Sequence, residues 1–411
     1  MDRIDTASQR PPAAPRSAAA PAPATEGELA ALIAEAATRR APLAIAGGGT
    51  RAGFGRPVDA APLSTRGLSG ITLYEPAELV ISARAGTPLS VVERELGSRG
   101  QMLPFEPFDH RPLYGSAGEP TVGGLVAVNA SGSRRIQAGA VRDSLIGVRA
   151  VTGTAEIVKS GGRVMKNVTG YDLVKLLAGS HGTLAVISEA TFKVLPAAET
   201  EATLVVSGLD DAAAVAALSA GLGSPFSVTG GAHVPGRDGA PATTAIRLEG
   251  FAASVADRAA RLAIGLKRFA SSEILDAGSS RSLWRGIAAL APLAAGESTP
   301  LWRLSLKPSA APAVVAAIRA ACACRVLYDW GGGLVWVAGG EGADAGAAVV
   351  RGAIAGLPGA HATLMRAPQA TRRAVPVFQP EAAPLAMLSA RLKREFDPAG
   401  ILNPGRMVAG V

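Results

Sequence analysis

The sequence predicts an α+β fold in which pairs of short strands alternate with single helices. Apolar residues fall at helical spacing after Gly27 and again after Pro88, whereas residues 71–74 and 79–84 alternate as two strands. Clusters of glycine and proline separate these segments. With 411 residues, 48% of them apolar, the chain is long enough for two or three domains and a large core.

The charge balance points to an anionic ligand and away from nucleic acid. The formal net charge is +8, but the arginines are spread along the chain and aromatic residues make up only 4%. A nucleic-acid interface would show clustered basic residues with interleaved aromatics. An anionic cofactor or substrate explains the bias more simply.

Cysteine content and hydropathy indicate a cytoplasmic protein. The two cysteines, Cys322 and Cys324, have the spacing of neither a zinc site nor an iron–sulfur cluster, so we expect small buried side chains in a reducing compartment and no bound metal. No apolar run reaches the length of a membrane span, and no signal-peptide core is present. We expect a soluble protein that can still dock on a membrane through a partner.

The N-terminal part carries the first glycine turn. Residues 1–24 are rich in Ala and Pro and are expected to be a disordered tail. A helix carrying Leu29 and Ile33 follows, and then a strand over 43–46 leads into the turn Gly47-Gly48-Gly49-Thr50-Arg51. The turn fits G-x-G-x-x-A, but the glycines and prolines after it leave no room for a Rossmann helix. An anion nest for a pyrophosphate and a purely structural turn both remain compatible with it.

The next elements frame a second glycine-rich stretch. The strands 71–74 and 79–84 turn at Pro76, and Thr87-Pro88 can start a helix that Gly100 ends. In PTVGGLVAVNASG, residues 120–132, adjacent glycines let the backbone approach a bulky ligand. A hairpin over 145–151 and 155–159, a short helix at 173–177 and a long strand over 182–195 complete this half.

The character of the chain changes at Pro196. Strands and helices up to about residue 366 occur twice in an order close to β-α-β-β-α-β, the ferredoxin-like unit, although no sequence repeat accompanies this order. We interpret the segment as a separate lobe. A last helix over 384–396 then leads to the C-terminal motif FDPAGILNPGRM.

Four motifs in this order resemble the FAD-binding oxidases of the vanillyl-alcohol-oxidase and p-cresol-methylhydroxylase (PCMH) type. They are GGGT, PTVGGLVAVNASG, GTLAVISEATFKVLP and FDPAGILNPGRM. The motif VMKNVTGYDL from Val164, LWRL from Leu301 and DWGG from Asp329 are similar to the FAD-binding E subunits of bacterial glycolate oxidase. The resemblance runs from about residue 25 to the end.

The resemblance implies a PCMH-type FAD-binding domain of two α/β subdomains over 25–196. A ferredoxin-like cap lobe would span 197–366, and residues 367–411 would return to the FAD domain. It implies that the pyrophosphate of FAD is held by backbone N–H groups of Gly47, Gly48, Gly49, Thr50 and Arg51, with Thr121, Gly123 and Gly124 continuing this cradle. Ser131 and Gly132 would run beside the flavin and ribityl chain, and Val186 and Ile187 would present backbone to the adenine. Arg142, Asp143 and Asn403 would lie close to the cofactor. For the glycines an ordinary tight turn, and for the last three an ion pair, a cap or a turn, are the structural alternatives.

The histidines bear on attachment and catalysis. Covalent attachment in this superfamily often uses a histidine, and none of His110, His181, His233 and His361 stands near the GGGT turn, so we expect non-covalent FAD. The metal-binding histidine motif of related hydroxy-acid dehydrogenases is missing. His110 is the best-placed candidate for proton transfer and Arg303 for holding a carboxylate, with an Arg303–Asp329 ion pair as the alternative. His181 is interpreted as structural, Lys166 and Tyr171 as loop residues that can face the flavin ring, and no residue is assigned as catalytic.

The resemblance implies an FAD-binding subunit of a glycolate oxidase, or D-2-hydroxy-acid dehydrogenase, that works with a second FAD-containing catalytic subunit and an iron–sulfur subunit. A self-sufficient flavin oxidase of a small alcohol or hydroxy acid is the first alternative. A non-catalytic scaffold that keeps the fold is the second.

Overall fold

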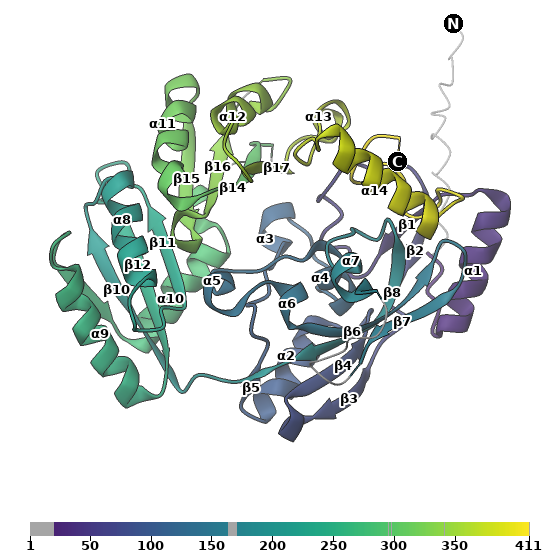
Figure 1. Ribbon diagram of the computed structural model, residues 1–411, viewed down its shortest axis with the longest axis horizontal. Coiled ribbons are helices and arrows are strands. Elements are labelled where there is room, and N and C mark those ends of the chain that lie inside the picture. The colour runs from purple at the N-terminus through teal and green to yellow at the C-terminus, as the bar shows by residue number, and fades with distance from the viewer. Residues whose placement is uncertain (1–19, 163–170, 295, 297, 341, 411) are drawn as a thin grey trace, which may run out of the picture.

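The computed structural model describes residues 20–162, 171–294, 296, 298–340 and 342–410. Most of the expected N-terminal tail and of the VMKNVTGYDL motif, including Lys166, lies outside them. Figure 1 shows two lobes side by side, with the last two helices lying over the first lobe. None of the helices in these ranges is long and apolar enough to cross a bilayer.

The first lobe begins with a helix and a parallel strand pair. Helix α1 (Glu26–Arg39) is capped by the Thr25 hydroxyl, which accepts a hydrogen bond from the Glu28 amide. Strand β1 (Leu43–Ala46), which the sequence predicted, pairs in parallel with β2 (Ala61–Ser64). Strand β2 was not predicted. The C-terminal motif joins the same layer through a parallel bridge between Leu43 and Leu402.

A five-stranded antiparallel sheet forms the rest of this lobe, in the order β3-β4-β8-β6-β7. Its strands are β3 (Ile71–Glu75), β4 (Val80–Arg84), β6 (Leu145–Thr152), β7 (Ile157–Gly161) and β8 (Ala185–Lys193). Helices α2 (Leu89–Ser98), α4 (Val122–Val128) and α7 (Leu173–Leu177) share one apolar core with it. Short elements complete the lobe: η1 (Pro76–Glu78), β5 (Gln101–Met102), β9 (Leu195–Pro196), α3 (Arg111–Tyr114), α5 (Arg135–Ala138) and α6 (Val141–Ser144).

The second lobe is built on an eight-stranded sheet, β13-β10-β12-β11-β15-β16-β14-β17. Its first half runs β10 (Thr200–Ser207), α8 (Asp211–Leu222), β11 (Gly230–Val234), β12 (Thr243–Gly250), α9 (Ala252–Leu266) and β13 (Ser272–Leu275). Its second half runs β14 (Leu301–Ser305), η3 (Pro308–Ala310), α11 (Ala311–Ala321), β15 (Cys324–Asp329), η4 (Trp330–Gly332), β16 (Leu334–Gly339), α12 (Ala347–Ile354) and β17 (His361–Arg366). Apart from the short 3-10 turns, each half is β-α-β-β-α-β. The two halves of the sheet join where β11 pairs with β15, at His233 and Tyr328. The ferredoxin-like prediction for the cap is confirmed.

Between the halves lie α10 (Ala277–Ala288) and η2 (Ala291–Leu293). The two cysteines are free, one at the C-terminal cap of α11 and the other in β15. Both are half-buried, where the sequence analysis expected buried side chains. The chain then returns to the first lobe through α13 (Gln369–Ala374) and α14 (Ala383–Phe396).

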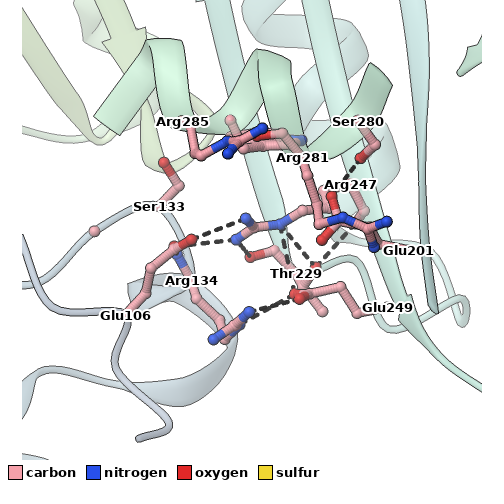
Figure 2. A network of polar contacts seen from close by, with 12 residues as sticks. Glu106, Ser133, Arg134, Glu201, Thr229, Arg247, Glu249, Ser280, Arg281 and Arg285 are labelled. Atoms are coloured by element: carbon pink, nitrogen blue, oxygen red, sulfur yellow. Dashed lines mark hydrogen bonds and ion pairs between the residues drawn. The ribbon is translucent and has the colours of Figure 1, made fainter. Parts of the chain in front are cut away.

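Buried ion pairs join the two lobes (Figure 2). Arg247 of β12 donates two hydrogen bonds to the Glu106 carboxylate of the first lobe, at 2.9 and 3.1 Å. Arg134 crosses in the other direction to Glu249, with its Nε 3.0 Å from a carboxylate oxygen. Trp330 also donates its indole N–H to the Gly132 carbonyl oxygen at 3.0 Å. The cap is therefore fixed against the end of the PTVGGLVAVNASG stretch.

Candidate functional site

The two glycine-rich stretches pack directly against each other. A Cβ atom on Gly47 would lie 2.1 Å from the Thr121 hydroxyl oxygen, and one on Gly48 would lie 1.6 Å from the Glu119 carbonyl oxygen. Gly49 has open space around it and a φ of +77°, a left-handed conformation that favours glycine. The first two glycines are therefore required by contact between loops, and the third by the turn itself.

PTVGGLVAVNASG is helical at its centre, so Gly123 and Gly124 do not form the tight turn that was the structural alternative for them. The Thr121 hydroxyl caps α4 by accepting from the Gly124 amide at 3.4 Å, and Asn129 ends the helix in a left-handed conformation. Val122, Leu125 and Val126 are buried in the core beneath. One end of a short helix thus meets the GGGT turn.

Two adjoining cavities lie where these segments meet the C-terminal motif. The larger, of about 550 Å³, is lined by residues 44–54 and by Thr121, Gly124, His181, Gln369, Arg372, Asn403 and Arg406, among others. The smaller, of about 60 Å³, continues it past Thr65, Gly123, Val186 and Ile187. Gly47, Gly124, His181 and Asn403 line both cavities.

The structure brings most of the predicted FAD residues to these cavities. They are Gly47, Gly48, Gly49, Thr50, Arg51, Thr121, Gly123, Gly124, Val186, Ile187 and Asn403. The Asn403 side chain fixes this corner, because it accepts from the Ile45 amide at 2.9 Å and donates to the His181 carbonyl oxygen at 2.8 Å.

Four predicted residues line neither cavity and have structural contacts instead. The Ser131 hydroxyl accepts from the Val141 amide at 3.1 Å, and Gly132 accepts the Trp330 indole. The Asp143 carboxylate accepts from the Ala140 amide at 2.8 Å, and the Arg142 amide donates to the Asn129 side chain. For Arg142 and Asp143 these contacts agree with the structural alternatives.

The larger cavity is positively charged. Arg51, Arg372 and Arg406 line it, and no aspartate or glutamate is among its lining residues. Nε and Nη2 of Arg51 are buried and lack a hydrogen-bond partner in the described part of the chain. Burial lowers the pKa of Arg51 to about 10, so the guanidinium is still charged at neutral pH. A buried guanidinium with two donors left free among the described residues, beside a glycine turn, fits a ligand with anionic oxygens.

His181, which we interpreted from the sequence as structural, lines both cavities. Its ring stands edge-on to Phe54 and Phe378, with centroids 4.8 and 5.0 Å away. Burial, with a smaller effect of the Arg406 charge, lowers its pKa to about 3, so the imidazole is neutral. The position was missed because the chain distance between residues 181 and 47 hides their proximity in space.

His110, the candidate for proton transfer, is enclosed. It is 1% exposed, its Nδ1 lies 3.2 Å from the Phe108 carbonyl oxygen, and it stacks between Phe54 and Tyr114. Burial and the nearby Arg51 charge hold its pKa well below the usual range. Tyr171, by contrast, is 91% exposed.

Arg303 does not form an ion pair with Asp329, the structural alternative for it, in the described part of the chain. Its guanidinium lies 5.1 Å from the centroid of the Trp330 ring, near which Arg135 also lies, at 4.8 Å. Asp329 instead accepts from the Ser133 hydroxyl and from the Trp330 amide, both at 2.7 Å. Burial raises the pKa of Asp329 to about 6.

These features fit FAD better than a metal. Within the described ranges, no group of three or more His, Cys, Asp or Glu side chains could hold a metal ion. The joined cavities instead offer cationic and backbone donors at the glycine turn, with an apolar extension along β8.

Residues 17–161 match the sequence family described as FAD binding domain. The chain is 36% identical to glycolate oxidase subunit GlcE of Escherichia coli over 377 residues, which cover 92% of this chain and 95% of that one. Over 186 residues it is 30% identical to glycolate oxidase subunit GlcD of Bacillus subtilis, covering 45% of this chain and 38% of the relative. A D-lactate dehydrogenase of Anaerostipes hadrus is 33% identical over 35% of this chain and 29% of its own length.

Among solved structures, the fold is similar to that of alkyldihydroxyacetonephosphate synthase. The TM-score is 0.64 at 17% identity, over 93% of this chain and 75% of the synthase chain. This likeness supports the α+β, PCMH-type fold.

Proposed function

Because the chain belongs to the family of the glycolate oxidase subunit GlcE, we propose that it is an FAD-binding subunit of a glycolate oxidase complex. The observation that carries the proposal is the cavity between the GGGT turn and α4. Three arginines and no carboxylate of the described chain line it, and Nε and Nη2 of the buried Arg51 find no hydrogen-bond partner in that part of the chain. Such a cavity suits the doubly charged pyrophosphate of FAD. The reaction served would be the oxidation of glycolate to glyoxylate.

The predicted FAD residues have distinct tasks in this proposal. Gly49 and Thr50 would present backbone N–H groups to phosphate oxygens, and Val186 and Ile187 would offer an apolar strand to the adenine. When bound, the flavin would supply a carrier for the electrons that the complex removes from the hydroxy acid. The glycine turn itself carries no histidine, and the His181 ring, which lines the cavity, packs against Phe54 and Phe378, so the FAD is proposed to be non-covalent.

We assign the substrate step to a partner subunit. A general base works best with a pKa near the working pH, whereas the pKa of His181 is about 3 and that of His110 lies well below its usual range. His110 is also closed in by aromatic rings. Neither imidazole suits proton abstraction from a hydroxy acid. The partners we propose are a second FAD-containing catalytic subunit and an iron–sulfur subunit, through which the complex can reach a membrane.

We also propose the division into an FAD domain (25–196), a cap lobe (197–366) and a C-terminal return (367–411). The cap would close over the flavin side of the site. The lobe contacts through Arg247 and Arg134 support a fixed rather than a freely hinged cap.

The purified chain tests this function through its visible spectrum. A stable flavin spectrum that neither glycolate nor D-lactate bleaches without oxygen, but that bleaches once the partner subunits are added, is the expected result. Bleaching by substrate in the isolated chain would favour the self-sufficient oxidase. A chain without any flavin, also after incubation with FAD, would favour the scaffold.

A further inference from the structure

Two arginines from the C-terminal part of the chain reach the same cavity as the GGGT turn. Arg372 lies on α13, the first helix after the last cap strand, and Arg406 lies in the C-terminal motif. Both line the larger cavity together with Arg51. None of the three is close to another in sequence, so the fold alone brings them together.

The loop over 52–55 orients both guanidiniums. Arg372 donates from Nη1 to the Gly55 carbonyl oxygen at 2.7 Å and from Nε to the Ala367 carbonyl oxygen at 3.2 Å. Arg406 donates from Nη1 to the Phe54 carbonyl oxygen at 3.1 Å. The Nη2 atoms of Arg372 and Arg406 have no hydrogen-bond partner in the described chain. Each side chain is thus held by one edge and keeps donors for a ligand.

The charges of these arginines are not neutralised inside the cavity. Burial lowers the pKa of both, and the charge of Arg372 further lowers that of Arg406. The neighbouring Arg373 differs, because it forms a bidentate pair with Asp59, with both N–O distances at 2.7 Å, on the surface. Of these two adjacent arginines, Arg373 is paired with a carboxylate, whereas Arg372 faces a cavity that no carboxylate of the described chain lines.

We propose that Arg372 and Arg406, with the buried side chain of Arg51, bind the pyrophosphate of FAD and so clamp the C-terminal return of the cap onto the cofactor. The proposal rests on the proposed function for the identity of the ligand. A pyrophosphate offers two negative charges and several acceptor oxygens, which suit guanidinium donors. Because Gln369 and Arg372 belong to the segment that follows β17, FAD binding would also hold the cap in place.

The test compares Arg372→Gln and Arg406→Gln with Arg373→Gln as the matched control. FAD affinity is measured by quenching of flavin fluorescence in the chain freed of cofactor, with ADP and adenosine as competitors. Hydrogen bonds to charged groups contribute about 1.5–3 kcal/mol, so we expect FAD and ADP to bind about 10- to 100-fold more weakly to the first two variants. Adenosine, which lacks phosphate, should bind all variants equally, and R373Q should bind like the wild type.

Hydrogen exchange provides a second readout that does not depend on activity. FAD should slow amide exchange over 369–374 in the wild type and in R373Q, but less in R406Q, where α13 itself is unchanged. If R372Q does not fold, R406Q carries both measurements. Wild-type FAD affinity in R372Q and R406Q, or an equal loss for ADP and adenosine, would overturn the arginine site. A wild-type chain that binds ADP but no flavin would instead remove the proposed function and leave the anion site.

Discussion

The buried ion pair between the lobes allows one prediction to be worked out in detail. Glu106→Gln removes the charge of the carboxylate that accepts two hydrogen bonds from Arg247 and one, at 2.8 Å, from the Arg134 amide. The Arg247 side chain is only 2% exposed, so it cannot recover solvation. The variant therefore leaves a buried cation with one of its two carboxylates missing.

The size of the effect follows from the remaining partners. Loss of one member of a buried ion pair costs about 3–5 kcal/mol when the other charge is left alone. Here Glu249 still lies 3.4 Å from Arg247, and a glutamine can still accept one hydrogen bond. We expect the free energy of unfolding to fall by about 2–3 kcal/mol at neutral pH.

The effect should depend on pH with a definite sign. Although burial opposes it, the Arg247 charge and hydrogen bonds lower the pKa of Glu106 in the folded protein. The ionised carboxylate then stabilises the fold above the unfolded-state pKa of about 4.3, and this stabilisation is lost as the pH falls through the lower folded-state pKa.

Urea unfolding followed by far-UV circular dichroism at pH 7 and pH 4 measures the difference between wild type and variant. Glu273→Gln, an exposed carboxylate on edge strand β13, is the control and should change little. A difference that stays constant between the two pH values, or that equals the control, would refute the ion-pair argument.

Three further predictions concern other buried groups. The folded-state pKa of Asp329, about 6, lies above its unfolded-state value, so the wild type should lose about 2 kcal/mol of unfolding free energy as the pH rises from 4 to 7. Asp329→Asn should not show this loss in urea titrations, and a difference between variant and wild type that is independent of pH would contradict the prediction. Gly48→Ala should lower both Tm and FAD affinity, since its Cβ would meet a carbonyl oxygen, whereas Gly97→Ala in open space on α2 should raise stability by about 0.5–1 kcal/mol. Lys393→Met should cost about 3 kcal/mol in urea unfolding, because it leaves the buried Asp397 carboxylate without the ammonium 2.6 Å away, and a cost below about 1 kcal/mol would show that the pair is solvated.

Much of the fold could be predicted from local pattern. The alternation over 71–84 gave β3 and β4, and the order of elements after Pro196 gave both ferredoxin-like halves. The pattern failed where context overrides propensity. Thr121-Val122-Gly123-Gly124 forms a capped helix although glycines disfavour one, because Val122, Leu125 and Val126 are buried against the sheet. Thr87 does not cap α2, since its hydroxyl accepts from the Gly70 amide and donates to the Gly70 carbonyl oxygen.

The glycines show how sequence and structure divide the information. A run such as Gly47-Gly48-Gly49 predicts that the backbone turns there or approaches another segment closely. Only the structure shows that Gly48 meets the Glu119 carbonyl oxygen, whereas Gly49 serves the left-handed turn. The same run therefore combines packing and turn roles that the sequence cannot separate.

By itself, the sequence determined the α+β class, the order of elements and the segments that meet at the candidate FAD site, because periodicity and glycine placement are properties of neighbouring residues. Tertiary structure alone decided which charged side chains meet there. Arg51, Arg372 and Arg406 gather at one cavity, and His181 joins them, because four segments that are distant in the sequence meet at the same corner of the first lobe. Long-range contacts of this kind depend on how the layers pack, which no local pattern encodes.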